Sequence, residues 1–312
     1  MAARAPVGQL EGSWKTQLLH ALGAVRPKNS IPRVWVDVGT SYKTLAKWDV
    51  NNNASLVVVG VDPVQSNIEH SDHPKTPRFV RVHGACAEGA PGFVTLNVHK
   101  SPTCASLHAT RRDAPAVGSG RDSCTGDVPT EVRVPKFPLR LLLKRVQHQV
   151  PGARVELLKL DVQGAELACL RSAGNALSMV DNILLEVQDA PDSSKLLMYE
   201  GAPSLGALDG FLRRHGHERQ YCEYNAVSRP LREVNCLYSN TANATVARKL
   251  WATANHQPWS SIVSYEALPR FVRPMAIVAP LLTSPEFPGQ RVLPATGARG
   301  RLGAAPRLRP LH

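Results

Sequence analysis

Aromatic residues, long apolar runs and several common catalytic motifs are scarce or missing in this sequence. Aromatic side chains make up 5% of its 312 residues, and no basic strand carries the row of aromatics on which single-stranded nucleic acids stack. No run approaches the ~18 apolar residues that a membrane-spanning helix needs. A G-x-S-x-G elbow and a P-loop are also absent. We therefore expect no membrane span and no nucleic-acid partner.

The cysteines show no C-x-x-C motif and no regular spacing. They are Cys86, Cys104, Cys124, Cys169, Cys222 and Cys236. The first ten residues contain one arginine and no apolar core of signal-peptide length. These features predict a cytoplasmic protein whose cysteines are reduced thiols. Because His215, His217 and the last two cysteines match no common zinc-ligand spacing, we expect no metal site.

The net charge of +12 is unevenly distributed along the chain. From Ala267 onward there are seven arginines and a single acid, Glu286, so this segment carries half of the charge. It also has eight prolines and no hydrophobic period, which is typical of disorder. We expect a helical extension at 1–30, one domain at 31–260 and a basic, Pro/Arg-rich tail at 261–312.

Three apolar segments each end at an acid that is followed by a glycine or a proline. They are Val34–Gly39 (V-W-V-D-V-G), Ser55–Pro63 (S-L-V-V-V-G-V-D-P) and Val155–Glu166 (V-E-L-L-K-L-D-V-Q-G-A-E). A buried strand that turns at its end into a helix is the βα step of a parallel sheet, and the first crossover helix is expected over 39–48. Tyr42 is expected on the inner face of this helix.

We also expect an alternating strand at 92–100 and a helix after Pro138 whose inward residues are Leu139, Leu142, Leu143 and Val146. The domain ends with two strands at 218–224 and 233–239, followed by a helix at 244–255. The order predicts an α/β fold with a doubly wound, mostly parallel Rossmann-like sheet and a terminal antiparallel hairpin.

The ends of the first two strands carry candidate ligand-binding residues. Gly39 allows a sharp turn and the close approach of a ligand, and Asp37 beside it can accept hydrogen bonds from a cationic group. With one glycine, D-V-G-T is a poor match to the G-x-G-x-x-G of dinucleotide sites. Asp62 ends the second strand, where an acid can bind ribose hydroxyls. The alternative interpretations are that Asp37 caps a helix and that Asp62 is a solvated turn acid.

The third strand ends in a second acidic constellation. Asp161 is expected to point into the cleft beside Asp37, and Glu166 to orient a neighbour or accept a proton. The alternative is that these acids only favour the positive end of the helix that follows. Glu186, near the end of the strand I-L-L-E-V, is a further strand-end carboxylate.

These segments resemble the FkbM-type methyltransferases that depend on S-adenosylmethionine. The resemblance spans roughly 33–239 and is most specific in K-L-D-V-Q-G-A-E. It implies a class I methyltransferase fold and S-adenosylmethionine as the cofactor. By this resemblance the methionine part lies at the first turn, the ribose at the second strand, the adenine at the third and the methyl group beside the last motif. The residues implied are Asp37, Gly39, Thr40, Asp62, Ala85, Cys86 and Asp161.

The sequence departs from the family pattern after Gly39. Thr40 stands where an alanine is usual, and Lys43 where a later glycine is usual. We expect an O-methyltransferase that acts on a hydroxyl of a small molecule or carbohydrate, with Asp161 and Glu166 as its catalytic residues. The alternatives are an inactive methyltransferase-like module that acts through partners, and a nucleic-acid or protein methyltransferase docked through the tail. Further candidates for a general base are His83, His99 and His108.

Overall fold

The computed structural model describes residues 7–25, 31–42, 44, 46–111, 124, 128–150, 152–189, 197–228 and 231–240. Within these residues, no helix combines the length and the apolar character needed to cross a bilayer. A helix expected at 244–255 and the tail at 261–312 lie outside them. The domain limits therefore stay predictions.

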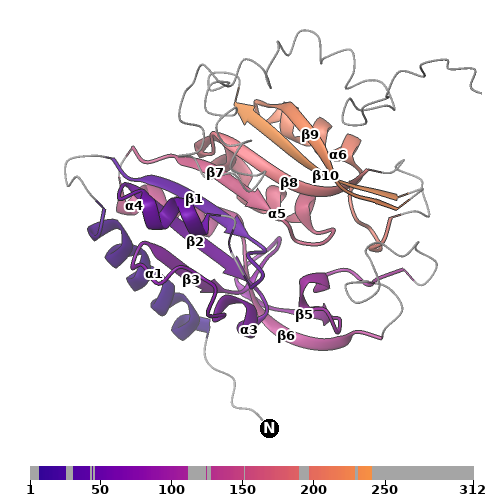
Figure 1. The fold of residues 1–312 in the computed structure, drawn as a ribbon, viewed down its shortest axis with the longest axis horizontal. Helices are drawn as coiled ribbons and strands as arrows, with labels where there is room; N and C mark the ends of the chain where they lie inside the picture. The colour runs from indigo at the N-terminus through magenta and orange to yellow at the C-terminus, as the bar shows by residue number, and fades with distance from the viewer. Residues whose placement is uncertain are drawn as a thin grey trace, which may run out of the picture. The chain divides into compact units, whose positions relative to one another are not determined.

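The main sheet has seven strands in the spatial order β3-β2-β1-β7-β8-β10-β9 (Figure 1). The strands β3, β2, β1, β7 and β8 are parallel, whereas β10 runs antiparallel to β8, and β9 to β10. The bounds are β1 Arg33–Val38, β2 Leu56–Asp62, β3 Phe79–His83, β7 Val155–Leu160, β8 Asn182–Asp189, β9 His217–Ser228 and β10 Leu231–Asn240. The predicted doubly wound sheet with its terminal hairpin is confirmed.

The central strands form because their side chains are apolar on both faces. All seven residues of β2 are buried, and so are the last five of β1. The chain builds β1, β2 and β3 outward in one direction and then returns to place β7 on the other side of β1. The connections that follow β1 and β7 therefore lead to strands on opposite sides of this pair, β2 and β8. In open α/β sheets, ligands bind at such a point of reversal.

Helices cover the sheet and its outer strand. The helix α1 (Val7–Gly23) lies along β3 (Figure 1), where Gln17 Oε1 accepts a hydrogen bond of 3.1 Å from the backbone N–H of Arg81. This contact helps to cover an edge strand. The helix α4 (Leu139–Gln149) buries its four predicted apolar residues, Leu139, Leu142, Leu143 and Val146. The others are α2 Lys47–Asn52, α3 Gln65–Ile68, η1 Pro102–Cys104, α5 Glu166–Ala173, η3 Gly174–Met179 and α6 Leu205–Arg214.

A second, three-stranded sheet starts directly after β3, where the parallel strands end. Its order is β4-β6-β5, with β4 Ala85–Cys86, β5 Gly92–Val98 and β6 Thr130–Phe137. The alternating strand predicted at 92–100 is thus an antiparallel partner of β6. The loop between β5 and β6 returns to the main sheet, where the hydroxyl of Ser106 donates a 2.6 Å hydrogen bond to the backbone oxygen of Gln163.

The predicted crossover helix at 39–48 is wrong. The backbone leaves the helical region at Gly39 (φ +81°) and again at Ser41 (φ +51°), and the helix α2 begins only at Lys47. Thr44 donates its hydroxyl hydrogen to Asp37 Oδ2 instead of continuing a helix. Tyr42, predicted on an inner face, is 40% exposed. The turn is therefore shaped by side-chain contacts to the strand ends.

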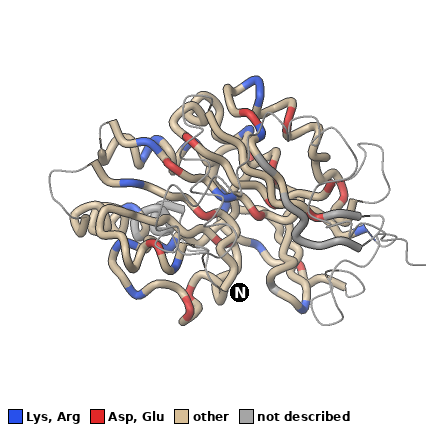
Figure 2. The backbone as a smooth tube through the Cα atoms, turned by 45° about the horizontal axis from the view of Figure 1, so that its top comes forward, with Lys and Arg blue, Asp and Glu red and all other residues tan. Residues whose placement is uncertain are grey.

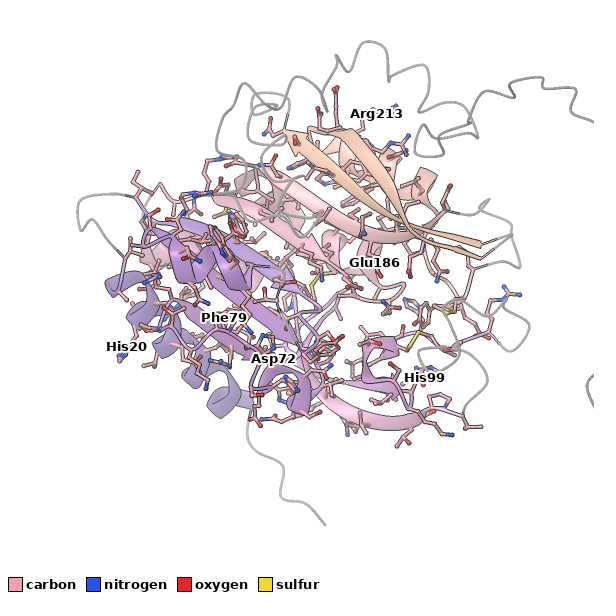
Figure 3. The ribbon with its side chains drawn as sticks, in the orientation of Figure 1. His20, Asp72, Phe79, His99, Glu186 and Arg213 are labelled. Carbon is pink, nitrogen blue, oxygen red and sulfur yellow. A yellow bond between two sulfur atoms is a disulfide. The ribbon has the colours of Figure 1, made fainter. Side chains whose placement is uncertain are left out.

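The prediction of reduced cysteines is also wrong, since all six are paired (Figure 3). The bridges are Cys86–Cys169, Cys104–Cys124 and Cys222–Cys236. They join β4 to α5, η1 to the loop before β6, and the two strands of the terminal hairpin. Disulfides persist mainly in oxidising compartments. The disulfides thus remove one of the two observations from which the cytoplasmic location was predicted, and that location stays a prediction.

Candidate functional site

Two backbone turns meet where β1 and β7 end. The N–H of Gly39 donates to Val61 O at 2.8 Å, and the N–H of Asp161 donates to Val38 O at 3.0 Å. A Cβ atom on Gly39 would lie 1.8 Å from the backbone oxygen of Asp161. With its positive φ, this position accepts only glycine. The glycine predicted from the sequence therefore lets the two strand ends approach each other.

Three charged side chains gather at this meeting point. Lys159 Nζ lies 3.1 Å from Asp161 Oδ2 and 3.4 Å from Asp37 Oδ1. It also donates to the backbone oxygen of Gly39 at 3.2 Å. Burial alone would lower the pKa of Lys159, but the charges of Asp161, Asp37 and Glu186 outweigh it and raise the pKa. Two carboxylates around one ammonium give this cluster a net charge of −1, which favours a cationic ligand group.

Asp62 holds the two loops that follow β1 and β2. Its Oδ2 accepts from the backbone N–H of Ser41 at 2.8 Å, and its Oδ1 from the N–H of Val64 at 2.8 Å. The side chain of Asn67 adds a donor at 3.3 Å. Burial raises the pKa of Asp62 to about 6, although these hydrogen bonds lower it. Asp62 thus lies at the predicted edge and braces the turn that contains Thr40.

The turn that Asp62 braces contains polar atoms without partners. Six buried side-chain nitrogen or oxygen atoms in the described residues have no hydrogen bond, and three belong to Asp37, Thr40 and Ser41. Asp37 Oδ1 has only its ion pair with Lys159. Buried polar groups are normally paired. Three such atoms within five residues therefore indicate a place where a bound ligand completes the hydrogen bonds.

The two residues predicted at the adenine side begin β4. Ala85 and Cys86 are 4% and 2% exposed, and the preceding Gly84 donates its N–H to Asp62 O at 2.9 Å. The sulfur of Cys86 is bonded to Cys169. Both residues therefore lie next to the end of β2. Since its side chain is committed to the disulfide, Cys86 has only its backbone to offer a ligand.

Glu166 closes the turn after β7. Its Oε1 accepts from the backbone N–H groups of Gly164 at 3.0 Å and Val162 at 3.2 Å. The side chain is buried, and burial raises the pKa of Glu166 to about 7 in spite of these hydrogen bonds. A carboxyl with this pKa exchanges a proton near neutral pH. Such a pKa suits a general base. The same hydrogen bonds also have a structural role, because they close the turn at the start of α5, of which Glu166 is the first residue.

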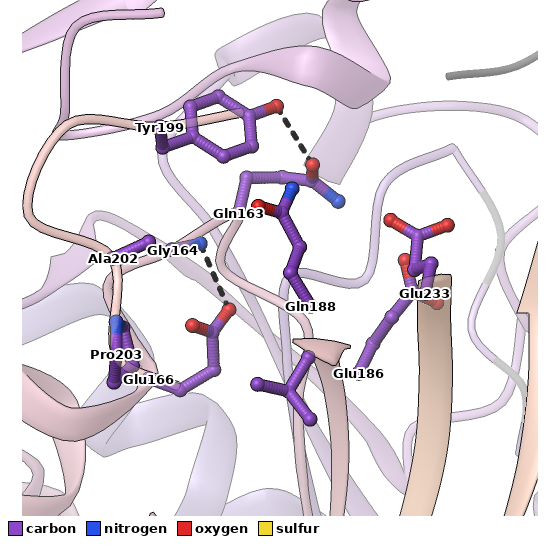
Figure 4. Close-up of a pocket in the computed structure, with 10 residues that line it drawn as sticks. Gln163, Gly164, Glu166, Glu186, Gln188, Tyr199, Ala202, Pro203 and Glu233 are labelled. Carbon is purple, nitrogen blue, oxygen red and sulfur yellow. Dashed lines mark hydrogen bonds between the residues drawn. The ribbon is translucent and has the colours of Figure 1, made fainter. Parts of the chain in front are cut away.

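A small pocket, partly open to solvent, lies beside this turn (Figure 4). Its polar lining is mostly acidic or amide: Gln163, Glu166, Glu186, Gln188, Tyr199 and Glu233. Burial raises the pKa of Glu186 well above its usual value, and the charges of Asp161 and Glu233 add to this effect. The pocket thus presents hydrogen-bond acceptors and carboxyl groups, Glu166 among them, to an occupant.

The structure brings some predicted residues together and separates others. Gly39 packs against the backbone of Asp161, the carboxylates of Asp37 and Asp161 share the ammonium of Lys159, and Glu166 lines the adjoining pocket. The three histidines considered as bases are not among the residues that line it. His83 bonds to Pro63 O at 2.9 Å, and His99 to the hydroxyl of Thr110 at 2.7 Å. These two histidines therefore have structural partners elsewhere.

Sequence reasoning missed several residues of the site. Lys159 lies in β7 and precedes Asp161, the second residue after it, at the end of the strand. In extended backbone, side chains two positions apart face the same way, so that spacing could have identified the ion pair. Tyr199 and Glu233 come from segments far along the chain. No local pattern connects them with the end of β7. Figure 2 shows acidic and basic residues interspersed along the described backbone, so this acidic pocket is a local feature.

Comparisons with known proteins give one family match. The family described as "Methyltransferase FkbM domain" matches residues 36–219, which is more than half of the chain. No curated protein is significantly similar to the chain in sequence.

Several solved structures of methyltransferases are distantly similar. Magnesium protoporphyrin IX methyltransferase from Synechocystis PCC 6803, with bound SAM, has a TM-score of 0.33 at 10% identity. The match covers 77% of this chain and 86% of the methyltransferase chain. The antibiotic-resistance methyltransferase Kmr has a TM-score of 0.35 at 13% identity, with 77% and 96% covered. The 30S ribosomal A1408 methyltransferase from an uncultured bacterium has a TM-score of 0.33 at 11% identity, with 73% and 94% covered.

Proposed function

The chain belongs to the FkbM methyltransferase family and depends on S-adenosylmethionine, and we propose that it methylates a hydroxyl oxygen of a small molecule or carbohydrate. The observation that carries this proposal is the polar pocket beside Asp161. Its carboxylates and amides accept hydrogen bonds from hydroxyl groups, and its carboxyls can take up the proton that an alcohol must lose.

The residues around Gly39 fit the cofactor. S-adenosylmethionine supplies an electrophilic methyl group on a sulfonium centre, and it also carries an ammonium, a carboxylate and ribose hydroxyls. Thr40 and Ser41 have hydroxyl oxygens that lack partners, and the cluster of Asp37, Asp161 and Lys159 is net negative. We propose that Asp37, Gly39 and Thr40 hold the methionine part, Asp62 the ribose, and Ala85 and Cys86 the adenine.

Asp161 and Glu166 are the proposed catalytic residues. Asp161 is held from two sides, by Lys159 at Oδ2 and by Gln163 at Oδ1, so its negative charge has a fixed position. Glu166 reaches the pocket from the next turn, and its pKa of about 7 allows it to accept the acceptor's proton at neutral pH. Transfer from a sulfonium is a displacement in which alignment in a dry site matters most. The packed turn around Gly164 supplies that alignment.

The test is a methyl-transfer assay with radiolabelled S-adenosylmethionine and a panel of acceptors. The panel contains sugars, phenols and aliphatic alcohols, matched deoxy or methoxy analogues, and an RNA and a protein pool. We expect label on an acceptor with a free hydroxyl and none on its deoxy analogue. Label on RNA or protein would refute the proposed acceptor class. Cofactor binding without transfer to any acceptor would support a binding module instead.

A further inference from the structure

The side chain of Gln163 bridges the acceptor pocket and Asp161. Its Nε2 donates to Asp161 Oδ1 at 3.0 Å, and its Oε1 accepts from the hydroxyl of Tyr199 at 2.8 Å. Figure 4 shows the Tyr199 hydroxyl pointing at the Gln163 amide, and both residues line the pocket. One amide thus links a pocket wall with a carboxylate at the end of β7.

The chemistry of the three groups fixes the direction of this chain of hydrogen bonds. Burial raises the pKa of Tyr199 well above its usual value, so the hydroxyl keeps its proton and can donate it. The amide oxygen can only accept, and the amide nitrogen can only donate. The opposite orientation would face the amide oxygen toward the Asp161 carboxylate. The order is therefore Tyr199 to Gln163 to Asp161.

The backbone commits Gln163 to this position. Its φ is +53°, and among the described residues only Ser41 is another non-glycine with positive φ. Its carbonyl oxygen accepts the 2.6 Å hydrogen bond from Ser106. Gly164 follows with φ +96°, and a Cβ there would lie 3.0 Å from Tyr199 Cβ. Uncommon backbone conformations held by several contacts are frequent at functional sites.

Tyr199 is itself anchored. It is 1% exposed, and the neighbouring residues are tied by backbone hydrogen bonds of Glu200 N to Ala109 O at 2.9 Å and of Arg111 N to Met198 O at 2.8 Å. The carbonyl oxygen of Cys104 lies 3.4 Å from the Tyr199 hydroxyl. The loop that contains Cys104 and Ser106 therefore supports both ends of the Tyr199–Gln163 pair.

We infer that Gln163 and Tyr199 are positioning residues, which hold the Asp161 carboxylate in one orientation and couple it to the occupant of the pocket. The inference rests on the proposed function for the role of Asp161 in methyl transfer. Because Lys159 holds Oδ2 and Gln163 holds Oδ1, loss of the amide donor leaves one oxygen of Asp161 without its partner. Tyr199 supports the same contact from one step further away.

The test variant is Gln163→Glu, which keeps the size of the side chain and the acceptor for Tyr199. It removes the N–H donor to Asp161 and places a second carboxylate beside it, and a like charge disfavours ionisation. We expect the carbon-13 chemical shift of the Asp161 carboxyl at pH 7, assigned with Asp161→Asn, to differ from that in the unmodified chain. We expect kcat to fall by about tenfold or more, with the acid limb of the pH–rate profile at higher pH and acceptor KM changed by less than about threefold.

Gln188→Glu is the matched control. Gln188 lines the same pocket, and its Oε1 accepts from Met198 N at 2.7 Å, a contact that glutamate retains. It should change the carbon-13 chemical shift of the Asp161 carboxyl by less than a third of the change in Gln163→Glu. Tyr199→Phe is the second variant, for which we expect a smaller fall in kcat of about threefold to tenfold.

The outcomes separate this inference from the proposed function. An unchanged carbon-13 chemical shift of the Asp161 carboxyl in Gln163→Glu, or an equal change in Gln188→Glu, overturns the inference even if the protein methylates hydroxyls. A shift confined to Gln163→Glu, in a protein that methylates no hydroxyl, supports the held carboxylate and overturns the proposed acceptor. If Gln163→Glu fails to fold, an unchanged kcat and pH profile in Tyr199→Phe overturns the inference.

Discussion

Replacing Glu166 with glutamine should stabilise the protein at alkaline pH and leave its stability unchanged in acid. The folded state raises the pKa of Glu166 from 4.5 to about 7, chiefly through burial. Between these values the folded state holds a proton that the unfolded state has lost. The free energy of unfolding therefore falls as pH rises from 4.5 to 7.

The magnitude follows from the size of the pKa shift. The rise in the pKa of Glu166 from 4.5 to about 7 corresponds to a change of about 3 kcal/mol in the free energy of unfolding. Because the side chain is 2% exposed, solvent screening does not reduce this figure much. Glutamine keeps an oxygen that can accept from Val162 and Gly164, and it carries no charge. We expect Glu166→Gln to gain about 3 kcal/mol over the unmodified chain at pH 8, and close to nothing at pH 4.

The assay is urea denaturation of both proteins at pH 4, 6 and 8. The control is the chain with Glu218→Gln, because Glu218 is an exposed glutamate. The difference in unfolding free energy should grow with pH for Glu166→Gln and stay flat for the control. The same variant should lose methyl transfer if Glu166 accepts the proton. A pH-independent difference would refute the assignment of a raised pKa to Glu166.

Three further predictions concern the strand ends and the disulfides. Gly39→Ala should weaken binding of S-adenosylhomocysteine, measured by calorimetry, by about tenfold or more. The added Cβ clashes with Asp161, and the positive φ costs about a further 1–2 kcal/mol, as it does for any alanine. Gly152→Ala is the control, because Gly152 has the same φ of +81° in open space and so shows the backbone cost alone in thermal unfolding and calorimetry. Thiol titration of the denatured, unreduced protein should find no free thiols, whereas six would contradict the three bridges. Paired replacement of Cys104 and Cys124 by serine should raise acceptor KM with little change in cofactor affinity, because that bridge holds the loop that contacts Tyr199; an unchanged KM would count against this role for the loop.

The parts of the fold that depend on apolar periodicity could be predicted from the sequence. Arg33–Val38 and the antiparallel hairpin were expected where they occur, because a buried strand needs an apolar run on at least one face. The doubly wound arrangement, in which strands are added on one side of β1 and later on the other, also follows from the order of the segments. These features are local, and the sheet rules connect them.

The misses have a common physical origin in contacts between distant segments. The turn after Gly39 is shaped by Asp62 and by the carboxylate of Asp37, which override the weak helical pattern of the segment. The disulfide of Cys86 with Cys169 joins residues 83 positions apart, so irregular spacing in the sequence says nothing about it. Tyr199 reaches Gln163 across 36 positions for the same reason.

The most direct test of the cofactor site is calorimetric titration of the purified, folded protein with S-adenosylhomocysteine, beside the variant Asp37→Asn. We expect binding with a Kd in the micromolar range, about −8 kcal/mol, and a Kd at least about tenfold weaker in Asp37→Asn. Equal binding by both proteins would contradict the placement of the cofactor at the ends of β1 and β7. No binding by the unmodified protein would contradict the fit of the cofactor to the turn at Gly39.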